Sequence, residues 1–274
     1  MRREAILTGI ALLVAAAAGA DVVIETETRD PRVPRGSGAP IERGRIWIDG
    51  LRLRAETGSS AGAGVVIFRG GGDGPRIWTL DPADRSYVEI DRETLGRVGE
   101  RLARARREME ARMASLPPEQ RAAVVRMMGD RAPVSAPLEA VDTGESDRVD
   151  ERTCRRYRLV RGGESQGDVC VLSWKEAGVR RTQLRVFREL ARFQRDVIES
   201  LGAAPGGQLG ALPFEVFDQL DGFPLRTRRL QDGTAIRETT FRLVDGAGSK
   251  GAGDARFALP ADYRRRELLP GGSR

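Results

Sequence analysis

Residues 154–170 read CRRYRLVRGGESQGDVC and contain both cysteines of the 274-residue chain. Apolar and polar residues alternate on either side of Gly162-Gly163, the pattern of two half-buried strands joined by a tight turn. If Cys154 lies directly opposite Cys170, Arg156 faces Asp168 as a cross-strand ion pair. Opposed residues of an antiparallel pair lie within disulfide range, so the stretch predicts a disulfide-closed β-hairpin. A redox-active pair is the alternative, although such pairs usually have CxxC spacing.

The first 20 residues, MRREAILTGIALLVAAAAGA, have the pattern of a cleavable secretory signal peptide. Arg2 and Arg3 precede an apolar run, and Ala18-Gly19-Ala20 forms a small-residue cleavage site. A membrane anchor is the alternative, but the run of roughly a dozen residues is shorter than the about 20 that a spanning helix needs. We therefore expect residues 1–20 to direct export to the periplasm, with cleavage near Ala20. That oxidising compartment favours the disulfide.

The rest of the chain shows strand patterns interrupted by helical insertions. Alternating apolar segments cover 21–29 and 44–57, the latter as one long strand or as a pair around Asp49-Gly50. Amphipathic helical spacing appears at 93–116, 117–129 and 181–202. No domain boundary is evident, so we expect one domain over 21–265 and a mobile C-terminal tail over 266–274. This order predicts an α+β fold, an antiparallel sheet with helices on one face.

The composition argues against the commonest catalytic and metal sites. The chain has no histidine, which excludes Ser-His-Asp and Cys-His catalysis and most zinc sites. A lysine base would have to be Lys175 or Lys250, and a solvated lysine is the favoured interpretation for both. Four acids cluster in one predicted turn region without EF-hand spacing: Asp81, Asp84, Glu89 and Asp91. We therefore expect no enzymatic activity, no metal and no cofactor.

The net charge of +6 comes from arginine, because Lys175 and Lys250 are the only lysines. A basic excess can indicate a nucleic-acid partner. The predicted export and the 40 interleaved acidic residues argue against nucleic acid here. Peripheral contact with an anionic membrane surface stays open.

Methionine is unevenly distributed along the sequence. Apart from Met1, every methionine falls in two adjacent helical segments: Met109, Met113, Met127 and Met128. Met109 and Met113 are four residues apart and share a helix face. Methionine forms adaptable apolar surfaces that suit ligands of variable shape, and ordinary packing of a helix on a sheet is the alternative.

The order of the segments resembles an uncharacterised family of exported bacterial proteins, domain of unknown function 4412. The resemblance covers most of residues 21–265 and is carried by IWIDGLRLRAE, VVIFRG, RIWTLD, SYVEID, CRRYRLVRGG, DGFPLRTRRL and FALPADY. The last of these contains Phe257, Pro260 and Tyr263. The layout is also similar to the LolA/LolB lipoprotein carriers and to the sensor RseB. The resemblance implies a strongly curved antiparallel half-barrel with helices across its concave face.

The same resemblance implies a periplasmic, non-enzymatic carrier that binds a lipid or another apolar ligand between sheet and helices. The candidate residues for that apolar cavity are Leu102, Met109, Met113, Met127, Met128, Phe187 and Leu190. A sensor or a protein that binds an envelope protein partner is the alternative, suggested by arginine-rich strand faces such as Arg156 and Arg158. A hydrolase is the third alternative. We expect a monomer.

Overall fold

The structure is a computed structural model, and it describes residues 22–34, 36–59, 62–72, 74–117, 119–120, 136–201, 216–244 and 253–268. The predicted signal peptide (1–20), most of the predicted helix 117–129 and the end of the predicted tail (269–274) lie outside the described residues. The candidate residues Met127 and Met128 therefore lie outside them as well.

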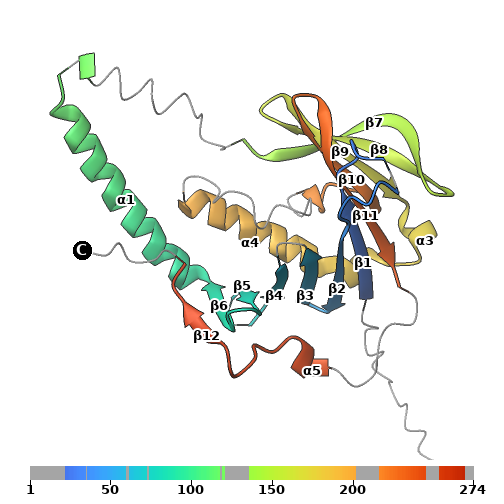
Figure 1. The fold of residues 1–274 in the computed structure, drawn as a ribbon, viewed down its shortest axis with the longest axis horizontal. Helices are drawn as coiled ribbons and strands as arrows, with labels where there is room; N and C mark the ends of the chain where they lie inside the picture. Colours follow the sequence, from blue (N-terminus) through green and yellow to red (C-terminus); the bar gives the residue numbers. More distant parts are fainter. Residues whose placement is uncertain are drawn as a thin grey trace, which may run out of the picture.

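Among the described residues, twelve strands form one sheet in the order β12-β6-β5-β4-β3-β2-β1-β11-β10-β9-β8-β7 (Figure 1). Adjacent strands are antiparallel except for β12, which runs parallel to β6. The first six strands are β1 (Val22–Arg29), β2 (Glu42–Asp49), β3 (Arg52–Ser59), β4 (Gly62–Arg69), β5 (Arg76–Asp81) and β6 (Ser86–Ile90). The others are β7 (Leu138–Val149), β8 (Arg152–Arg161), β9 (Glu164–Leu172), β10 (Phe223–Gln231), β11 (Thr234–Leu243) and β12 (Arg264–Arg266).

The sheet consists of two groups of consecutive strands joined through β1. Strands β2 to β6 follow one another as neighbours, and so do β7 to β11. Strand β1 pairs with β2 on one side and with β11 on the other, so the N-terminal strand connects both groups. The helices are α1 (Arg92–Ala114), α3 (Trp174–Ala177), α4 (Arg185–Leu201) and α5 (Gly253–Arg256), with a 3-10 turn η1 (Arg181–Leu184) before α4. The α+β prediction is confirmed as a mixed fold with one mostly antiparallel sheet.

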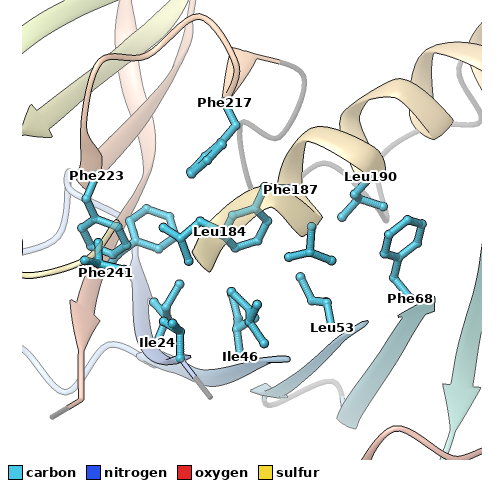
Figure 2. Close-up of a cluster of buried hydrophobic side chains, with 14 of the residues drawn as sticks. Ile24, Ile46, Leu53, Phe68, Leu184, Phe187, Leu190, Phe217, Phe223 and Phe241 are labelled. Atoms are coloured by element: carbon cyan, nitrogen blue, oxygen red, sulfur yellow. The ribbon is translucent and has the colours of Figure 1, made fainter. Parts of the chain in front are cut away.

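Helix α4 covers the apolar face of the central strands. Its side chains Phe187 and Leu190 point toward Ile46 and Leu53 of the sheet (Figure 2). Phe193 is 1% exposed and packs its ring against Phe68 at a centroid distance of 6.4 Å. The predicted amphipathic face is thus the core-facing side of the helix, because these side chains bury their apolar surface against the strands.

The buried residues of helix α1 lie near its start. The Asp91 carboxylate caps the helix by accepting a hydrogen bond from the Thr94 backbone N–H at 2.8 Å. Leu95 and Val98 are buried, whereas most of the residues after them are exposed. The helix extends away from the sheet beside β6 and β12 (Figure 1). None of the helices in the described part of the chain has the length and apolar character that crossing a membrane requires.

The hairpin prediction is right about the disulfide and wrong about the register. Cys154 and Cys170 form the bond with their Cα atoms 5.5 Å apart, and both side chains are buried. However, Cys170 lies opposite Arg156, and Asp168 lies opposite Arg158. The turn at Gly162-Gly163 pairs Arg161 with Glu164, and an irregularity between Leu159 and Val160 shifts the remaining pairs. The disulfide and the 3.8 Å Arg156–Asp168 ion pair are therefore diagonal contacts.

Among the described residues, the Gln219 side chain covers the start of the outer edge of β7. The Gln219 amide accepts a hydrogen bond from the Ala140 backbone N–H at 2.8 Å and donates one to the Leu138 carbonyl at 3.1 Å. These are the groups that a further strand would bond, so Gln219 takes the place of a pairing strand. Beyond Asp142 the β7–β8 register is interrupted, and this also disfavours edge-to-edge pairing.

Replacing both Cys154 and Cys170 by alanine is expected to lower the free energy of unfolding by about 3 kcal/mol, because the unfolded chain gains the freedom of a loop of about 15 residues. Urea denaturation followed by circular dichroism measures this loss. Wild-type protein unfolded with a reductant is the control and should show a similar decrease. An unchanged midpoint in both samples would contradict the stabilising role of the bond.

Replacing Gln219 by alanine is expected to expose the β7 edge and to cause concentration-dependent self-association. The monomer should lose about 1 kcal/mol of stability, since two hydrogen bonds are exchanged for bonds to water. Sedimentation velocity over a range of concentrations measures the association. Gln231→Ala, at the exposed end of β10, is the matched control. Equal behaviour of the two variants would show that Gln219 does not protect the edge.

Candidate functional site

A row of four small side chains, ending at the larger Phe241, crosses the sheet on the face that also carries the core. The row consists of register partners on β11, β1, β2, β3 and β4: Phe241, Thr26, Gly44, Thr57 and Gly64. The next row along the strands is larger, with Ile24, Ile46, Ala55 and Val66. The row after that contains Val22, Ile48, Leu53 and Phe68. Side-chain size therefore decreases toward one end of these strands.

An open cavity of about 1030 Å³ lies over the small row. Its lining includes five runs of consecutive residues, one from each strand, and each run is centred on a member of the row: 25–27, 43–45, 56–58, 63–65 and 240–242. Side chains alternate between the two faces of a strand, so the central residues share the core-bearing face and their neighbours point to the other face. We call Phe241, Thr26, Gly44, Thr57 and Gly64 the trough.

Gly44 is the position in the trough where a larger residue does not fit. A Cβ atom there would lie 2.6 Å from the Thr26 hydroxyl oxygen and 2.9 Å from the Glu56 carbonyl oxygen. At Gly64 a Cβ atom would lie 3.1 Å from the Thr57 hydroxyl oxygen. Glycine at these two positions leaves the space above the backbone open, because it has no side chain to fill it.

The walls of the cavity combine apolar and charged groups. Leu225 and Phe241 are both buried and stand beside the half-buried Val149. The turn between β7 and β8 adds Asp150 and Glu151, together with Arg152 at the start of β8. One end of the cavity is therefore apolar, and the adjoining turn is charged. Such a mixture suits a ligand with an apolar body and a polar group.

The opposite face of the same strands carries an exposed ladder of ion pairs. The Glu25 carboxylate accepts hydrogen bonds from Arg45 and Arg242, each at 2.6 Å. These hydrogen bonds lower the pKa of Glu25 below its ordinary value. Glu25 therefore keeps its negative charge between the two arginines across the physiological pH range.

A second set of charges is buried between β1, β10 and β11. The Glu238 carboxylate accepts hydrogen bonds from Arg29 at 2.6 Å and from Arg228 at 2.8 Å, and its side chain is only 3% exposed. Burial alone would raise the pKa of Glu238, but the hydrogen bonds from the two arginines outweigh burial and lower it. Arg226 is also buried and pairs with Asp147 of β7. These pairs connect β1, β7, β10 and β11.

Asp168 lies near the same arginines, but its pKa is raised, whereas the pKa of Glu238 is lowered. Burial raises the pKa of its carboxyl group, and the nearby Arg228, Arg156 and Arg226 compensate only in part. Its Oδ1 atom has no hydrogen-bond partner among the described residues. A buried carboxylate without full hydrogen bonding costs stability, so the ionised form of Asp168 is disfavoured.

The predicted cavity residues that the structure describes do not line the cavity over the trough. Phe187 and Leu190 are buried in the core beneath α4. Leu102 and Met109 lie on α1 and are 40% and 45% exposed, and Met113 on the same helix is half-buried. The trough was missed because glycine and threonine within a single strand give no signal of a binding site. They form a surface only through the register between strands.

The residues considered for catalysis have structural roles or are exposed to solvent. Ser173 caps α3, and Lys175 is exposed. Lys250 lies outside the described residues. The clustered acids are engaged as follows: Asp81 caps a turn, Asp84 pairs with Arg264, Glu89 pairs with Arg76 and Arg265, and Asp91 caps α1. Within the described part of the chain, no group of three or more acids or cysteines is arranged to hold a metal ion.

Comparison with known proteins gives no family. No family model matches the chain, and no curated protein matches it. Among solved structures, the chain is similar to an uncharacterized conserved protein from Thermus thermophilus, with a TM-score of 0.42 and 9% identity over 90% of this chain and 91% of that chain. It is also similar to a chain in the MucA/MucB complex structure of Pseudomonas aeruginosa, with a TM-score of 0.34 and 13% identity over 93% of this chain and 63% of that chain. The resemblance to domain of unknown function 4412 stays a prediction.

Glu238→Gln and Asp168→Asn are expected to differ in their effect on stability. At pH 7, Glu238→Gln should cost roughly 3 kcal/mol, because it leaves Arg29 and Arg228 without their buried counter-charge. Asp168→Asn should cost much less, since burial already disfavours its ionised form. The folded pKa of Glu238 lies below its ordinary value of 4.5, so its contribution is present above pH 4.5 and disappears as the pH falls below it.

Urea denaturation of the wild type and both variants between pH 3 and pH 7 tests this contrast. The difference between the wild type and Glu238→Gln should shrink toward pH 3. An equal and pH-independent loss for the two variants would show that the buried charges act only through packing.

Proposed function

We propose that this protein is a non-enzymatic binding protein that holds a lipid or another elongated, apolar ligand in the trough. The observation that carries the proposal is the open cavity of about 1030 Å³ with a floor of threonine and glycine beside an apolar wall. Ligand sites commonly have volumes of about 300–1,000 Å³ and are mostly apolar with a few polar groups. No catalytic group is required, because the ligand is only bound and released.

The shape of the floor favours an elongated ligand. Five neighbouring strands contribute one residue each to the trough, and strands lie about 4.8 Å apart, so the trough, including Phe241 at one end, is about 19 Å long. A long acyl chain laid across the strands would bury its surface against Leu225 and Phe241 and gain about 25 cal/mol per Å² of apolar area. A polar end could lie near Asp150 and Arg152 in the charged turn.

In this proposal the sheet acts as a curved half-barrel, and the trough lies on its concave face beside α4. The proposed site differs from the one expected from the sequence, because strands and the β7–β8 turn line it instead of helical residues such as those of α1 and α4. A periplasmic location is part of the proposal. The Cys154–Cys170 bond supports it, since disulfides persist in oxidising compartments.

A role in binding an envelope protein is the second candidate. It is supported by the exposed apolar side chains Leu102 and Met109 on α1. A protein partner could cover this helix while the trough stays empty. Copurification of a lipid with the protein favours the first candidate, and its absence favours the second.

The first experiment is native mass spectrometry of protein purified from the periplasm without detergent, followed by organic extraction. The proposal predicts a bound lipid or fatty acid. Titration with a fluorescent fatty acid then measures affinity. Thr57→Trp should weaken binding at least about tenfold, because the indole fills the trough and displaces ligand contacts.

Thr234→Trp is the matched control, because it makes the same change at an exposed position of β11 outside the cavity. Circular dichroism spectra should show that both variants fold. Binding that is equal in the two variants, or a wild type that takes up neither lipid nor probe, would refute the proposal.

A further inference from the structure

A second cavity, of about 290 Å³, lies between the start of α1 and the C-terminal strand β12. Four arginines and two glutamates are among the residues that line it: Arg97, Arg101, Arg265, Arg266, Glu89 and Glu267. The lining residues alone carry two more positive than negative charges, and Glu93, Asp81 and Asp84 pair with Arg97 and Arg266 from outside the cavity. This cavity shares no residue with the trough.

Two separate parts of the chain bring these arginines together. Arg97 and Arg101 are four residues apart, so they lie on the same side of α1. Arg265 and Arg266 belong to β12, which pairs in parallel with β6 directly before α1 begins. Asp91 caps α1 and holds the start of the helix at the end of β6. The cluster therefore depends on pairing between distant segments and is not visible in the sequence.

Arg101 and Arg266 retain hydrogen-bonding capacity, whereas Arg97 already donates to the Glu93 carboxylate at 2.5 Å. Arg101 has an ion pair with Glu267 at 3.6 Å, and Arg266 has ion pairs with Asp84 at 3.5 Å and with Asp81 at 3.9 Å. These distances are at or beyond the limit of a hydrogen bond, and each guanidinium carries five N–H donors. The side chains of Arg101 and Arg266 are 57% and 47% exposed, so a ligand can reach them.

Glu89 occupies the inner side of the cavity and is already neutralised. Its side chain is 12% exposed and lies between Arg76 at 3.4 Å and Arg265 at 3.3 Å. The remaining acid, Glu267, is 68% exposed and can move away from Arg101. An incoming anion would therefore meet arginine donors without a fixed negative charge in front of them.

We propose that this cavity is a binding site for a phosphate ester. Guanidinium groups bind phosphate oxygens in a bidentate manner, and arginine is preferred over lysine where that geometry matters. Val98 and Leu268 add an apolar wall beside the arginines. A soluble phosphomonoester and the headgroup of an anionic phospholipid share the required chemistry. If the ligand is a phospholipid, the exposed Leu102, one helical turn beyond Val98, would contact the part of the acyl chains next to the headgroup.

Two probes test the site: glycerol 3-phosphate by isothermal titration calorimetry, and vesicles of phosphatidylglycerol or of phosphatidylcholine by sedimentation. The double variant R101Q/R266Q should bind glycerol 3-phosphate or phosphatidylglycerol vesicles at least about tenfold more weakly than the wild type. The control R104Q/R107Q removes the same charge from exposed positions of α1 outside the cavity. It should change binding less than about twofold.

Loss of glycerol 3-phosphate binding in R101Q/R266Q alone supports a site for soluble phosphate esters. Wild-type binding to phosphatidylglycerol vesicles only, again lost in R101Q/R266Q alone, supports a phospholipid headgroup. If R104Q/R107Q weakens binding as much as R101Q/R266Q, binding depends on net charge alone and the proposal is wrong. A wild-type protein that binds neither probe would also overturn the proposal. Fatty-acid binding in the trough should be unchanged in R101Q/R266Q, so the two proposals fail or succeed separately.

Discussion

The pairing of β1 with both β2 and β11 is the constraint on which the rest of the structure depends. Without it, β2 to β6 and β7 to β11 would be separate groups of strands. The buried hydrogen bond between the Thr28 and Thr239 hydroxyls and the buried Arg29–Glu238 ion pair both lie along the β1–β11 contact. A buried ion pair adds little net stability but disfavours alternative registers, since a shift would leave each charge without its partner.

That register also creates the trough. Pairing Thr26 with Phe241 and Gly44 places the small residues of several strands side by side. The large residues Ile24 and Ile46 fall one row further along, where α4 covers them. The same sheet face therefore supplies a packed core at one end of the strands and a hollow at the other. The cavity therefore forms within one sheet, because side chains become smaller along the strands.

Arginine has three different roles in this protein. Arg29 and Arg228 are held by the buried Glu238 and fix strand positions. Arg45 and Arg242 balance Glu25 on an exposed strand face. Arg101 and Arg266 have only long ion pairs within the described part of the chain and face a small cavity. Of these six arginines, Arg101 and Arg266 are the pair that faces a cavity and retains donors for an anion.

Strand segments, the amphipathic helix α4 and the disulfide could be predicted from the sequence, because each depends on local periodicity or on the presence of just two cysteines. The sequence did not reveal the hairpin register, since the irregularity between Leu159 and Val160 leaves no mark in the alternation of apolar and polar residues. It also placed Leu102 and Met109 on an apolar helix face without showing that this part of α1 leaves the sheet. The positions of the trough and of the arginine-lined cavity follow from the pairing of strands and helices in the folded chain. Both form between segments far apart in the chain, and alternation within one strand carries no information about which strand lies beside it.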